Sequence, residues 1–507
     1  MSTDLESAQA ALFKQLDQRF EQDLPGMAQD MCHVVAPWYM AVRPARCVWS
    51  AVPNDGAHAP SRPIPAGTRV EAIANAQKSH WQTLGEHVLP ALRIKRCQLE
   101  QNNDSATLVL EIDLSDAESI MAGPIDVAFF CPPGQAVVSP WLWLLCEGVT
   151  AVSLEMGEHG VDLPLPVLHQ NLWQVDGPDK GACLWLEWLR YPAQFGFFSQ
   201  QLRFPDKAQP RKTAVVRWVI DSAKLPMVKH IAPNLKLHCL VLENRYATDA
   251  VPFERSPRKH AYLLQAPTLH QAHPFAIAAI QQVRSWQPEH QRHHDYETIG
   301  RFGLQHAQGR RCYSVRYLQG QDAALHWQLH FAPRVMANHH AEYMQIAVDC
   351  YQPHIAQIFA AHTIQATGSA ELQDVVLSPQ GLPSVALQPD FAIAHWLVGH
   401  LSQRHFALDS MAGWQAWWQR CAMGLPKSIQ PRALRYEHGL VSVNTTETVL
   451  VEKGQAYPGK NLTLTFAAGT FSHVAEQWLF ANIWQAVVQQ HAPLTHRYCV
   501  QVVEQDA

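Results

Sequence analysis

Histidine is the residue type in this chain that most invites a chemical role. The sequence contains 28 histidines among 507 residues, and imidazole nitrogen is a common ligand of zinc and iron. Three groups are dense enough to be considered as metal sites: His290, His293 and His294 with Asp295; His339 and His340 with Glu342; and His395, His400 and His405. A histidine-bound metal enzyme is therefore one hypothesis for the function.

The spacing of these histidines does not favour a shared metal ion. Members of the third group are five residues apart, which places successive side chains well around a helix from one another. The first two groups could each supply two ligands. Neither has the HExxH pattern, in which two imidazoles share one helical face with a carboxylate base. We therefore expect no metal and no cofactor, and we interpret these histidines as solvated loop residues.

Other catalytic signatures are missing from the sequence. It contains no GxSxG elbow, no Walker loop and no GxGxxG after a strand. Cys239 and Cys312 could act as nucleophiles, but a buried free thiol is the commoner state of such a cysteine. The cluster of Trp414, Trp417 and Trp418 could stack on a ligand, although packing into a core or against a partner explains it more simply. We expect a protein that is not an enzyme.

The composition is low in charge and rich in tryptophan, which two kinds of protein could explain. The 39 basic and 44 acidic residues give a net charge of -5 without a basic block, so neither nucleic acid nor an anionic membrane surface is an expected partner. Only 16% of the residues are charged and 17 are tryptophan, whereas an average soluble protein has about 25% charged residues. Coverage by other chains explains these values, and so does a monomer with a large core.

No stretch has the pattern of a secretion signal or a membrane span. The N-terminus lacks a basic region followed by an apolar one. The nearest apolar run, Trp141 to Cys146, is far too short to cross a bilayer. The 11 cysteines are scattered, with no CxxC pair, which fits reduced thiols. We expect a cytoplasmic protein without direct membrane insertion.

Periodicity predicts the elements that must position any site. Helical spacing predicts an opening helix from Leu5 to Phe20, a short helix from Met27 to Val35 and a helix near Phe275 to Trp286. The middle of the chain alternates apolar and polar residues between prolines, which predicts antiparallel sheets. Strands are expected at 108–114, 141–145, 149–154, 183–188, 215–220, 312–317, 325–331 and 342–351.

The C-terminal stretch has the most distinctive pattern. We expect a strand at Asn461 to Phe466, a helix that begins near Ser472, and a closing strand at Tyr498 to Val503. From Trp478 to Val488 this helix has apolar residues on almost every side. A surface helix has one apolar stripe, so this helix must be covered from more than one direction.

Further elements are expected just before that unit. Asp390 could cap a helix from Phe391 to Phe406, and Asp409 or Ser410 could cap the next helix, which carries the tryptophan stripe. The segments 440–443 and 448–451 are interpreted as the two arms of a β-hairpin.

The fold class is therefore α+β, with several domains. We expect a short helical segment at residues 1–58, a strand-rich domain at 59–230 and a second strand-rich domain with long loops at 231–385. A C-terminal α+β domain at 386–507 would end in the strand-helix-strand unit.

Several stretches, in order along the chain, resemble the TssF family of type VI secretion baseplate wedge proteins. They are LPGMAQDMCHVVAPWYMAVRP (24–44), PIPAGT (63–68), EWLRYPAQFGFF (187–198), NLKLHC (234–239) with the asparagine-to-tyrosine segment after it, and GKNLTLTFAAGTF (459–471). In the third stretch the matching positions are Glu187, Trp188, Pro192, Phe195, Phe197 and Phe198. None is a catalytic signature, but the ordered set is specific.

The sequence departs from the family pattern in three places. Family members usually begin with a helical segment containing Y-Y-x-x-E-L-x-x-L, and this chain starts downstream of it. The C-T-N-R-D-L-P stretch is not recognisable, and Asn461 stands where an acidic residue precedes TLTF. The chain is similar to a divergent member of the family that lacks the usual N-terminal helical segment.

The resemblance implies a structural subunit of a contractile injection machine. Two copies would join one TssG-like subunit in a wedge, and six wedges would surround a VgrG-like spike hub at the cytoplasmic face of the inner membrane. TssK-like and TssE-like subunits would link the wedge to the membrane complex and to the sheath. Baseplate opening would change the orientation of the wedge. A phage tail or an extracellular injection particle is the alternative setting.

The composition agrees with an assembly subunit, because obligate interfaces resemble protein cores and depend on aromatic anchors. The candidate interaction residues are Trp414, Trp418, Trp478, Phe480 and Trp484. For those on the terminal helix, a contact between two copies and the core of their own domain are equally compatible with the pattern.

Overall fold

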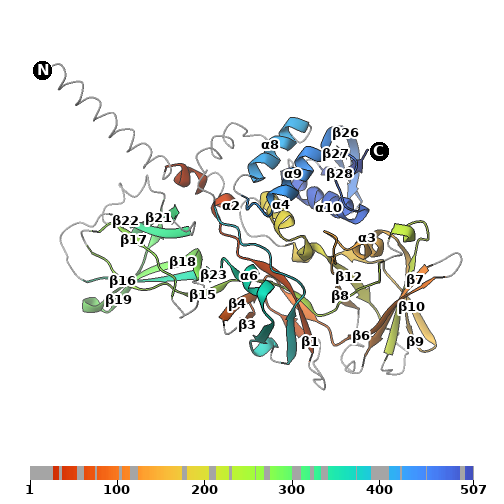
Figure 1. The fold of residues 1–507 in the computed structure, drawn as a ribbon, viewed down its shortest axis with the longest axis horizontal. Helices are drawn as coiled ribbons and strands as arrows, with labels where there is room; N and C mark the ends of the chain where they lie inside the picture. Colours follow the sequence, from red (N-terminus) through yellow and green to blue (C-terminus); the bar gives the residue numbers. More distant parts are fainter. Residues whose placement is uncertain are drawn as a thin grey trace, which may run out of the picture.

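A computed structural model describes residues 27–505 (Figure 1). Within that range it leaves out residues 34–36, 54–61, 75–76, 102–105, 115–123, 174–179, 205–212, 228–230, 257–258, 268–274, 300–309, 320–324, 333–340, 373, 390–409, 423–424, 453 and 492–496. The helices expected at Leu5 to Phe20 and at Phe391 to Phe406 lie outside the described residues. The helix expected from Met27 is present over residues 27–33.

A six-stranded antiparallel sheet in the middle of the molecule collects segments that are distant in sequence. Its strands, in spatial order, are β24 (Ile364–Gly368), β3 (Arg69–Ala74), β4 (Gln77–Thr83), β14 (Cys239–Glu243), β1 (Arg46–Pro53) and β25 (Val375–Pro379). Trp49 and Trp81 pack with Phe359 of helix α6 (Ile355–Ala361) in one core. This sheet takes strands from both sides of the expected boundaries at 59 and 231, and the division into domains stays a prediction.

A second group of strands lies beside this sheet. One sheet has the order β10 (His159–Leu163), β9 (Val149–Met156), β13 (Thr213–Ile220), β7 (Ala106–Asp113) and β6 (Arg93–Gln101). A smaller sheet has the order β11 (Val167–Leu168), β12 (Phe197–Leu202) and β8 (Ile125–Phe130). The strands expected at 108–114, 149–154 and 215–220 are confirmed as β7, β9 and β13.

Two expected strands in this region are helices. Residues 141–145 belong to α3 (Pro140–Glu147), and residues 183–188 belong to α4 (Lys180–Arg190). Both predictions were wrong because a short, mostly apolar run fits a buried strand and a buried helix equally well. The proline at the first position of α3 is a helix-start signal that favoured the other interpretation.

A third group of strands forms two further sheets. One has the order β15 (Tyr246–Asp249), β23 (Tyr343–Tyr351), β18 (Ala276–Gln287) and β19 (Arg292–Asp295), with β16 (Phe253–Glu254) also paired to β23. The other has the order β17 (Ala261–Leu263), β22 (Leu325–Phe331), β21 (Cys312–Gln319) and β20 (Glu297–Thr298). The strands expected at 312–317, 325–331 and 342–351 are confirmed.

The helix expected near Phe275 to Trp286 is strand β18. Its pairing with β23 shifts register at Ile277/Ala279 and again at Ile280/Gln282. Each shift is a bulge that adds one residue to the strand. The added residues put apolar side chains three positions apart, which imitates a helical period.

The C-terminal part of the chain from Met411 onward, called the C-terminal domain below, confirms the strand-helix-strand ending. Its elements are α8 (Met411–Ala422), α9 (Gln430–Gly439), β26 (Leu440–Glu452), β27 (Gln455–Phe466), α10 (Val474–His491) and β28 (Arg497–Glu504). Strand β28 runs parallel to β27, and α10 connects them. The Ser410 hydroxyl accepts the backbone N–H of Gly413 at 3.1 Å, so Ser410 caps α8 as expected.

The expected hairpin arms at 440–443 and 448–451 are parts of one strand, β26. The polar residues between them continue the strand, and the hairpin is made by β26 and β27. Gly454 forms the turn with a φ of 80°, a conformation that glycine adopts without strain. The multidomain α+β fold class with antiparallel sheets is confirmed. No helix among the described residues is long and apolar enough to cross a membrane.

Candidate interaction site

Helix α4 lies between the C-terminal domain and the rest of the molecule (Figure 1). All of its residues from Gly181 to Arg190 are buried. It packs against α10 on one side. On the other side its Glu187 side chain reaches strand β1 and its Arg190 side chain reaches the segment before β1. We therefore describe the candidate site as the two sides of this helix.

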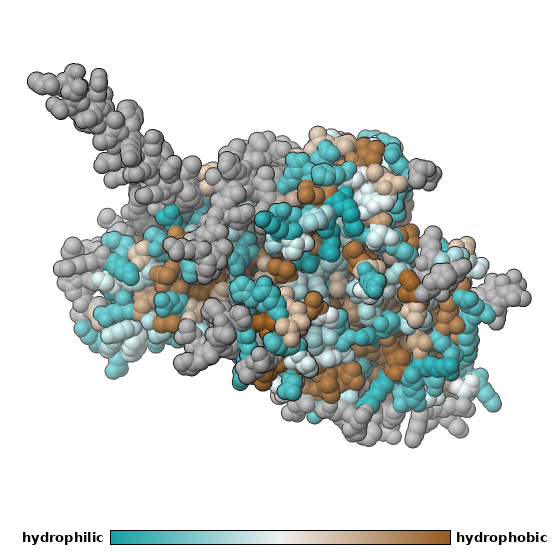
Figure 2. Space-filling model, viewed as in Figure 1, coloured by the Kyte–Doolittle hydropathy of each residue, from teal (hydrophilic) through white to brown (hydrophobic). Residues whose placement is uncertain are grey.

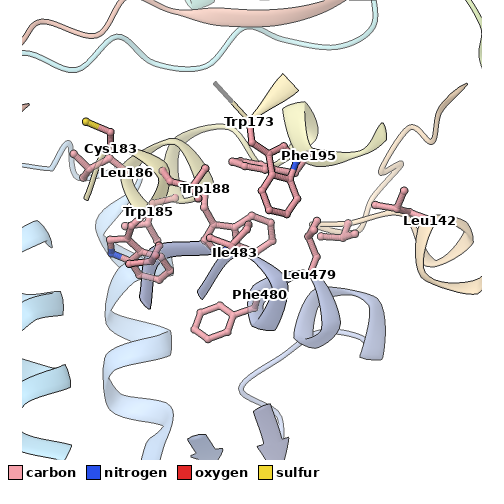
Figure 3. Packing of buried hydrophobic residues seen from close by; sticks show 14 of the residues in the cluster. Leu142, Trp173, Cys183, Trp185, Leu186, Trp188, Phe195, Leu479, Phe480 and Ile483 are labelled. Atoms are coloured by element: carbon pink, nitrogen blue, oxygen red, sulfur yellow. The ribbon is translucent and has the colours of Figure 1, made fainter. Parts of the chain in front are cut away.

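The aromatic cluster occupies the side of α4 that faces α10. It consists of Trp185 from α4, Trp414 and Trp418 from α8, and Phe480 and Trp484 from α10. The Trp484 ring centre lies 4.6 Å from that of Trp414, 5.0 Å from that of Trp185 and 5.5 Å from that of Trp418. Each of the five side chains is at most 1% exposed. Figure 3 shows Trp185 and Phe480 facing each other across this contact.

Helix α10 is apolar on almost every side because the chain itself covers it on several sides. It packs on β28 within its own unit, and on α3 and α4 from the middle of the chain. Leu479 and Ile483 are completely buried, and Figure 3 shows them close to α4. The covering surface that the sequence required is thus supplied by the same chain, through β28, α3 and α4 together with the tryptophans of α8.

The five predicted interaction residues lie in two different settings. Trp414, Trp418, Phe480 and Trp484 fill the core of the isolated chain. Trp478 is half-buried, and its Nε1 donates a hydrogen bond to Glu147 Oε1, at the end of α3, at 2.8 Å. A direct role for these residues in contacts with other chains stays a prediction.

The aromatic cluster is stabilised by burial and ring contacts more than by polar bonds. The indole Nε1 atoms of Trp185, Trp418 and Trp484 are buried without a hydrogen-bond acceptor among the described residues. A buried N–H without an acceptor costs about 1–3 kcal/mol. Apolar burial and edge-on ring geometry must therefore outweigh that cost.

The charged cluster occupies the opposite side of α4. It consists of Arg43, Arg46, Glu187, Arg190 and Glu243, all less than 9% exposed. The Glu187 carboxylate lies 2.6 Å from Arg190, 3.2 Å from Arg46 and 3.3 Å from Arg43. Arg46 also lies 3.2 Å from Glu243 on β14. The cluster therefore joins α4 to two strands of the central sheet and to the segment before β1.

The position of Glu187 makes it the central residue of the charged cluster. Complete burial alone would raise the pKa of its carboxyl group, but the guanidinium groups of Arg190, Arg46 and Arg43 outweigh burial and lower the pKa to about 2. Arg190 also donates to the backbone oxygens of Arg43 at 2.8 Å and Pro44 at 2.6 Å. Glu187 is thus ionised, and each arginine near it has a partner.

A second link joins the C-terminal domain to α4. Arg432 of α9 donates from Nη1 to the backbone oxygen of Leu189, near the end of α4, at 2.6 Å. The last carbonyl groups of a helix lack partners within the helix, and a cation there is also favoured by the helix dipole. This contact adds a polar bond to the apolar side of the junction.

Sequence reasoning identified Glu187 only as a matching family position and missed the charged cluster. A usable signal was present in LWLEWLR, where a glutamate and an arginine three positions apart interrupt an apolar run. Charged residues are almost never fully buried unless they are paired. Arg46 on β1 and Glu243 on β14, the other members of the cluster, carry no comparable signal, because their proximity to α4 depends on the sheet.

The candidate metal residues do not form a cluster in the described part of the chain. His290 and His293 are exposed, and the His293 ring packs on Trp286 at 4.7 Å. Glu342 is fully buried, lies 3.6 Å from Arg255 and accepts a hydrogen bond from Tyr296 at 2.8 Å. No group of three or more histidine, cysteine or acidic residues with metal-binding geometry occurs among the described residues. The remaining histidines of the three groups, apart from His294, lie outside them: His339, His340, His395, His400 and His405.

The candidate nucleophiles are buried thiols. Burial raises the pKa of the Cys239 thiol to about 12, so it is protonated at neutral pH. Cys312 is 1% exposed. All 11 cysteines are free.

Comparison with known proteins identifies a family and a fold. The family model described as "Type VI secretion system, TssF" matches residues 5–506. One similar solved chain, from a type VI secretion TssK-TssF-TssG baseplate subcomplex, has a TM-score of 0.78 and 15% sequence identity. The match covers 100% of this chain and 97% of that one.

A second solved chain is less similar. It comes from the baseplate complex of the type VI secretion system and has a TM-score of 0.58 and 14% identity, over 98% of this chain and 89% of that one. A comparison with curated protein sequences finds no match. At such identities these two structures establish a shared fold.

Proposed function

This chain belongs to the TssF family of the type VI secretion system, and we propose that it is a structural subunit of the baseplate wedge. The observation that carries the proposal is the family match over residues 5–506. The likeness of the whole fold to a chain in a TssK-TssF-TssG baseplate subcomplex supports it. We propose no catalytic role for this subunit.

The proposed partners are the proteins of the same assembly. The TssK-TssF-TssG composition of the similar structure supports a TssG-like and a TssK-like partner. We further propose that the wedge contains a second copy of this chain, and that TssE-like and VgrG-like subunits contact the assembled baseplate. The assembly would lie in the bacterial cytoplasm, against the inner membrane.

The two sides of α4 support a mechanical role. The aromatic cluster joins α4 to the C-terminal domain, and the charged cluster joins it to the central sheet. Interfaces packed like protein interiors have low compressibility and transmit displacement. During baseplate opening these parts would rotate together as one body, and the switch would occur at contacts with other subunits.

The decisive experiment is a measurement of stoichiometry. The chain should be co-expressed with the TssG-like and TssK-like proteins encoded beside it and purified through a tag on the TssG-like protein. We expect two copies of this chain for each TssG-like subunit, by native mass spectrometry. A chain that stays monomeric and binds neither neighbour would overturn the proposal.

Neighbouring genes separate the two settings of a contractile machine. TssG-, TssK- and TssE-like genes next to this one would support secretion. Holin, lysin or receptor-fibre genes would instead place the chain in a phage tail or an extracellular particle.

A further inference from the structure

The three-stranded sheet of the C-terminal domain has two edges, which differ in how far other parts of the chain cover them. Strand β28 forms one edge and β26 forms the other, with β27 between them. An uncovered edge presents backbone N–H and C=O groups that can pair with another strand. The question is therefore which of the two edges is left open.

Glutamines of α10 occupy the edge of β28. Gln477 Nε2 donates to the backbone oxygen of Val502 at 2.7 Å. Gln485 accepts the N–H of Val500 at 2.7 Å and donates to the oxygen of Tyr498. The C=O of a strand residue and the N–H two positions later point to the same side, so these bonds follow one edge of β28. This edge is closed to another strand.

The edge of β26 has no such cover. No strand among the described residues pairs with its outer side. Every residue from Ser442 to Val451 is exposed or half-buried, although α8 and α9 contact part of the strand. Val449 is 66% exposed and Val451 is 72% exposed. Figure 1 draws β26 at the outer end of the domain, and Figure 2 shows apolar surface in that region.

Apart from two glutamates, Glu447 and Glu452, strand β26 lacks the devices that usually protect an edge. The strand is 13 residues long and contains neither lysine nor proline. Its single register shift, between Leu440 and Ser442, lies at one end and leaves residues 442–452 regular. A long regular edge with exposed valines is a template for strand pairing.

The sequence of β26 is complementary to itself. In LVSVNTTETVLVE, an antiparallel pairing centred on Thr446 places Val443 opposite Val449, and it places Asn444 opposite Thr448. The only charge within residues 442–450, Glu447, would face Thr445. No like charges oppose each other, and branched apolar side chains meet across the strands, which favours this register.

We propose that β26 pairs with β26 of a second copy of this chain, antiparallel and centred on Thr446. The two domains would then form one six-stranded sheet around a two-fold axis. Self-complementarity favours a second copy over an unrelated strand, because a two-fold interface requires each patch to match itself. This inference rests on the proposed function, in which the wedge contains two copies, and it names the surface that joins them.

A single cysteine tests the register. In this pairing the two copies of Thr446 face each other with Cα atoms about 4.5–5.5 Å apart, within the span of a disulfide. The full chain with T446C should form a covalent dimer under mild oxidation, in the purified chain and in the complex with the TssG-like subunit. The matched control is Q501C, because Gln501 is exposed on the closed edge strand β28. Wild-type chain corrects for the 11 native cysteines.

A pair of lysines tests the edge without new covalent bonds. V449K together with V451K should weaken self-association by at least about tenfold, because lysine is a natural edge protector. Sedimentation velocity measures the association, and circular dichroism checks that the melting temperature is unchanged. The control V503K places the same charge on β28, where Val503 is 45% exposed, and should leave association unchanged.

The outcomes separate this inference from the proposed function. A T446C dimer above the Q501C and wild-type background supports the pairing. A complex with two copies per TssG-like subunit in which T446C does not crosslink overturns the pairing and leaves the function intact. A T446C crosslink to the TssG-like subunit overturns the choice of a second copy. If the chain neither associates with itself nor forms a complex with the TssG-like subunit, both the pairing and the proposed function are overturned.

Discussion

The two sides of helix α4 are equally buried but are held by different forces. The aromatic cluster buries a large apolar area, and this hydrophobic stabilisation does not depend on a particular orientation of the side chains. Three of its indole N–H groups have no acceptor among the described residues. The charged cluster contributes close pairs in which each member satisfies another. The aromatic side should therefore tolerate a conservative change in side-chain size. The charged side should not tolerate the loss of one charged partner.

Replacement of Trp484 by glutamate should have the largest effect. It removes a buried ring, which costs about 3–5 kcal/mol, and it places a carboxylate among aromatic rings, which adds several kcal/mol more. We expect the chain to unfold or precipitate, as judged by circular dichroism and solubility.

The control for that experiment is W484F, which keeps an aromatic ring and should remain folded. A folded W484E chain that fails only to assemble would place Trp484 at a contact between chains. The aromatic side would then no longer be a core.

Replacement of Glu187 by glutamine should have the next largest effect. It leaves buried arginines without their shared carboxylate, which costs about 3–5 kcal/mol. Chemical denaturation of the full chain measures the loss of unfolding free energy. E158Q, at an exposed turn, should change stability by less than about 0.5 kcal/mol. If E187Q lowers the unfolding free energy by less than about 1 kcal/mol, the charged side of α4 tolerates the loss of a partner and does not differ from the aromatic side in this respect.

Acid should distinguish the two sides. The pKa of Glu187 is about 2 in the folded chain and about 4.5 unperturbed, so its stabilisation is present above pH 4.5 and is lost as the pH falls toward 2. The difference corresponds to about 3 kcal/mol. E187Q should flatten the dependence of unfolding free energy on pH in that window, while W484F should keep it.

A buried histidine, His87, changes the stability of the chain at a higher pH than Glu187 does. The pH dependence of both residues should be measured together. Burial and the nearby His169 lower the pKa of His87 to about 4 from 6.5. Protonation therefore favours the unfolded chain, and stability falls as the pH decreases from 6.5 to 4. Burial also lowers the pKa of His33 and His238, so H87Q should reduce that loss without altering the loss that Glu187 causes as the pH falls toward 2. If H87Q leaves the slope of unfolding free energy against pH unchanged between pH 6.5 and 4, His87 does not contribute there. If E187Q leaves the slope unchanged below pH 4.5, Glu187 does not contribute there.

Replacement of Trp478 by phenylalanine should have the smallest effect. The ring is kept, and only the hydrogen bond to Glu147 is lost, which is worth about 0.5–1.5 kcal/mol. E147A should cost a similar amount, and the double variant should cost less than the sum because both changes remove the same bond. Fully additive effects would mean that this bond contributes nothing to the junction.

Local pattern was sufficient for much of the fold and insufficient for the candidate site. Strands with clean alternation, such as β7 and β13, were predicted within two residues of their observed bounds. Helix α4 was mistaken for a strand because residues 183–188 are short and mostly apolar, and the polar side of the helix is marked there only by Glu187. Strand β18 was mistaken for a helix because two bulges changed its period.

The same limit applies to function. Motifs in order along the chain indicated the family, because they are local in sequence and need no structure to be read. The charged cluster escaped because its members come from α4, β1, β14 and the segment before β1. Only the tertiary structure brings Glu187 within 3.3 Å of Arg43 and Arg46, and Arg46 within 3.2 Å of Glu243.

The sequence by itself determined that helix α10 must be covered on nearly every side. Its residues from Trp478 to Val488 leave no broad polar face, and hydrophobic burial demands a covering surface. Only the tertiary structure decided that α3, α4 and α8 of the same chain contribute to it, and that β26 is left as the open edge. The period of the apolar residues shows how many sides of a helix must be buried. It does not show which surface buries them, because the hydrophobic effect is non-directional and any apolar surface of the right shape would serve.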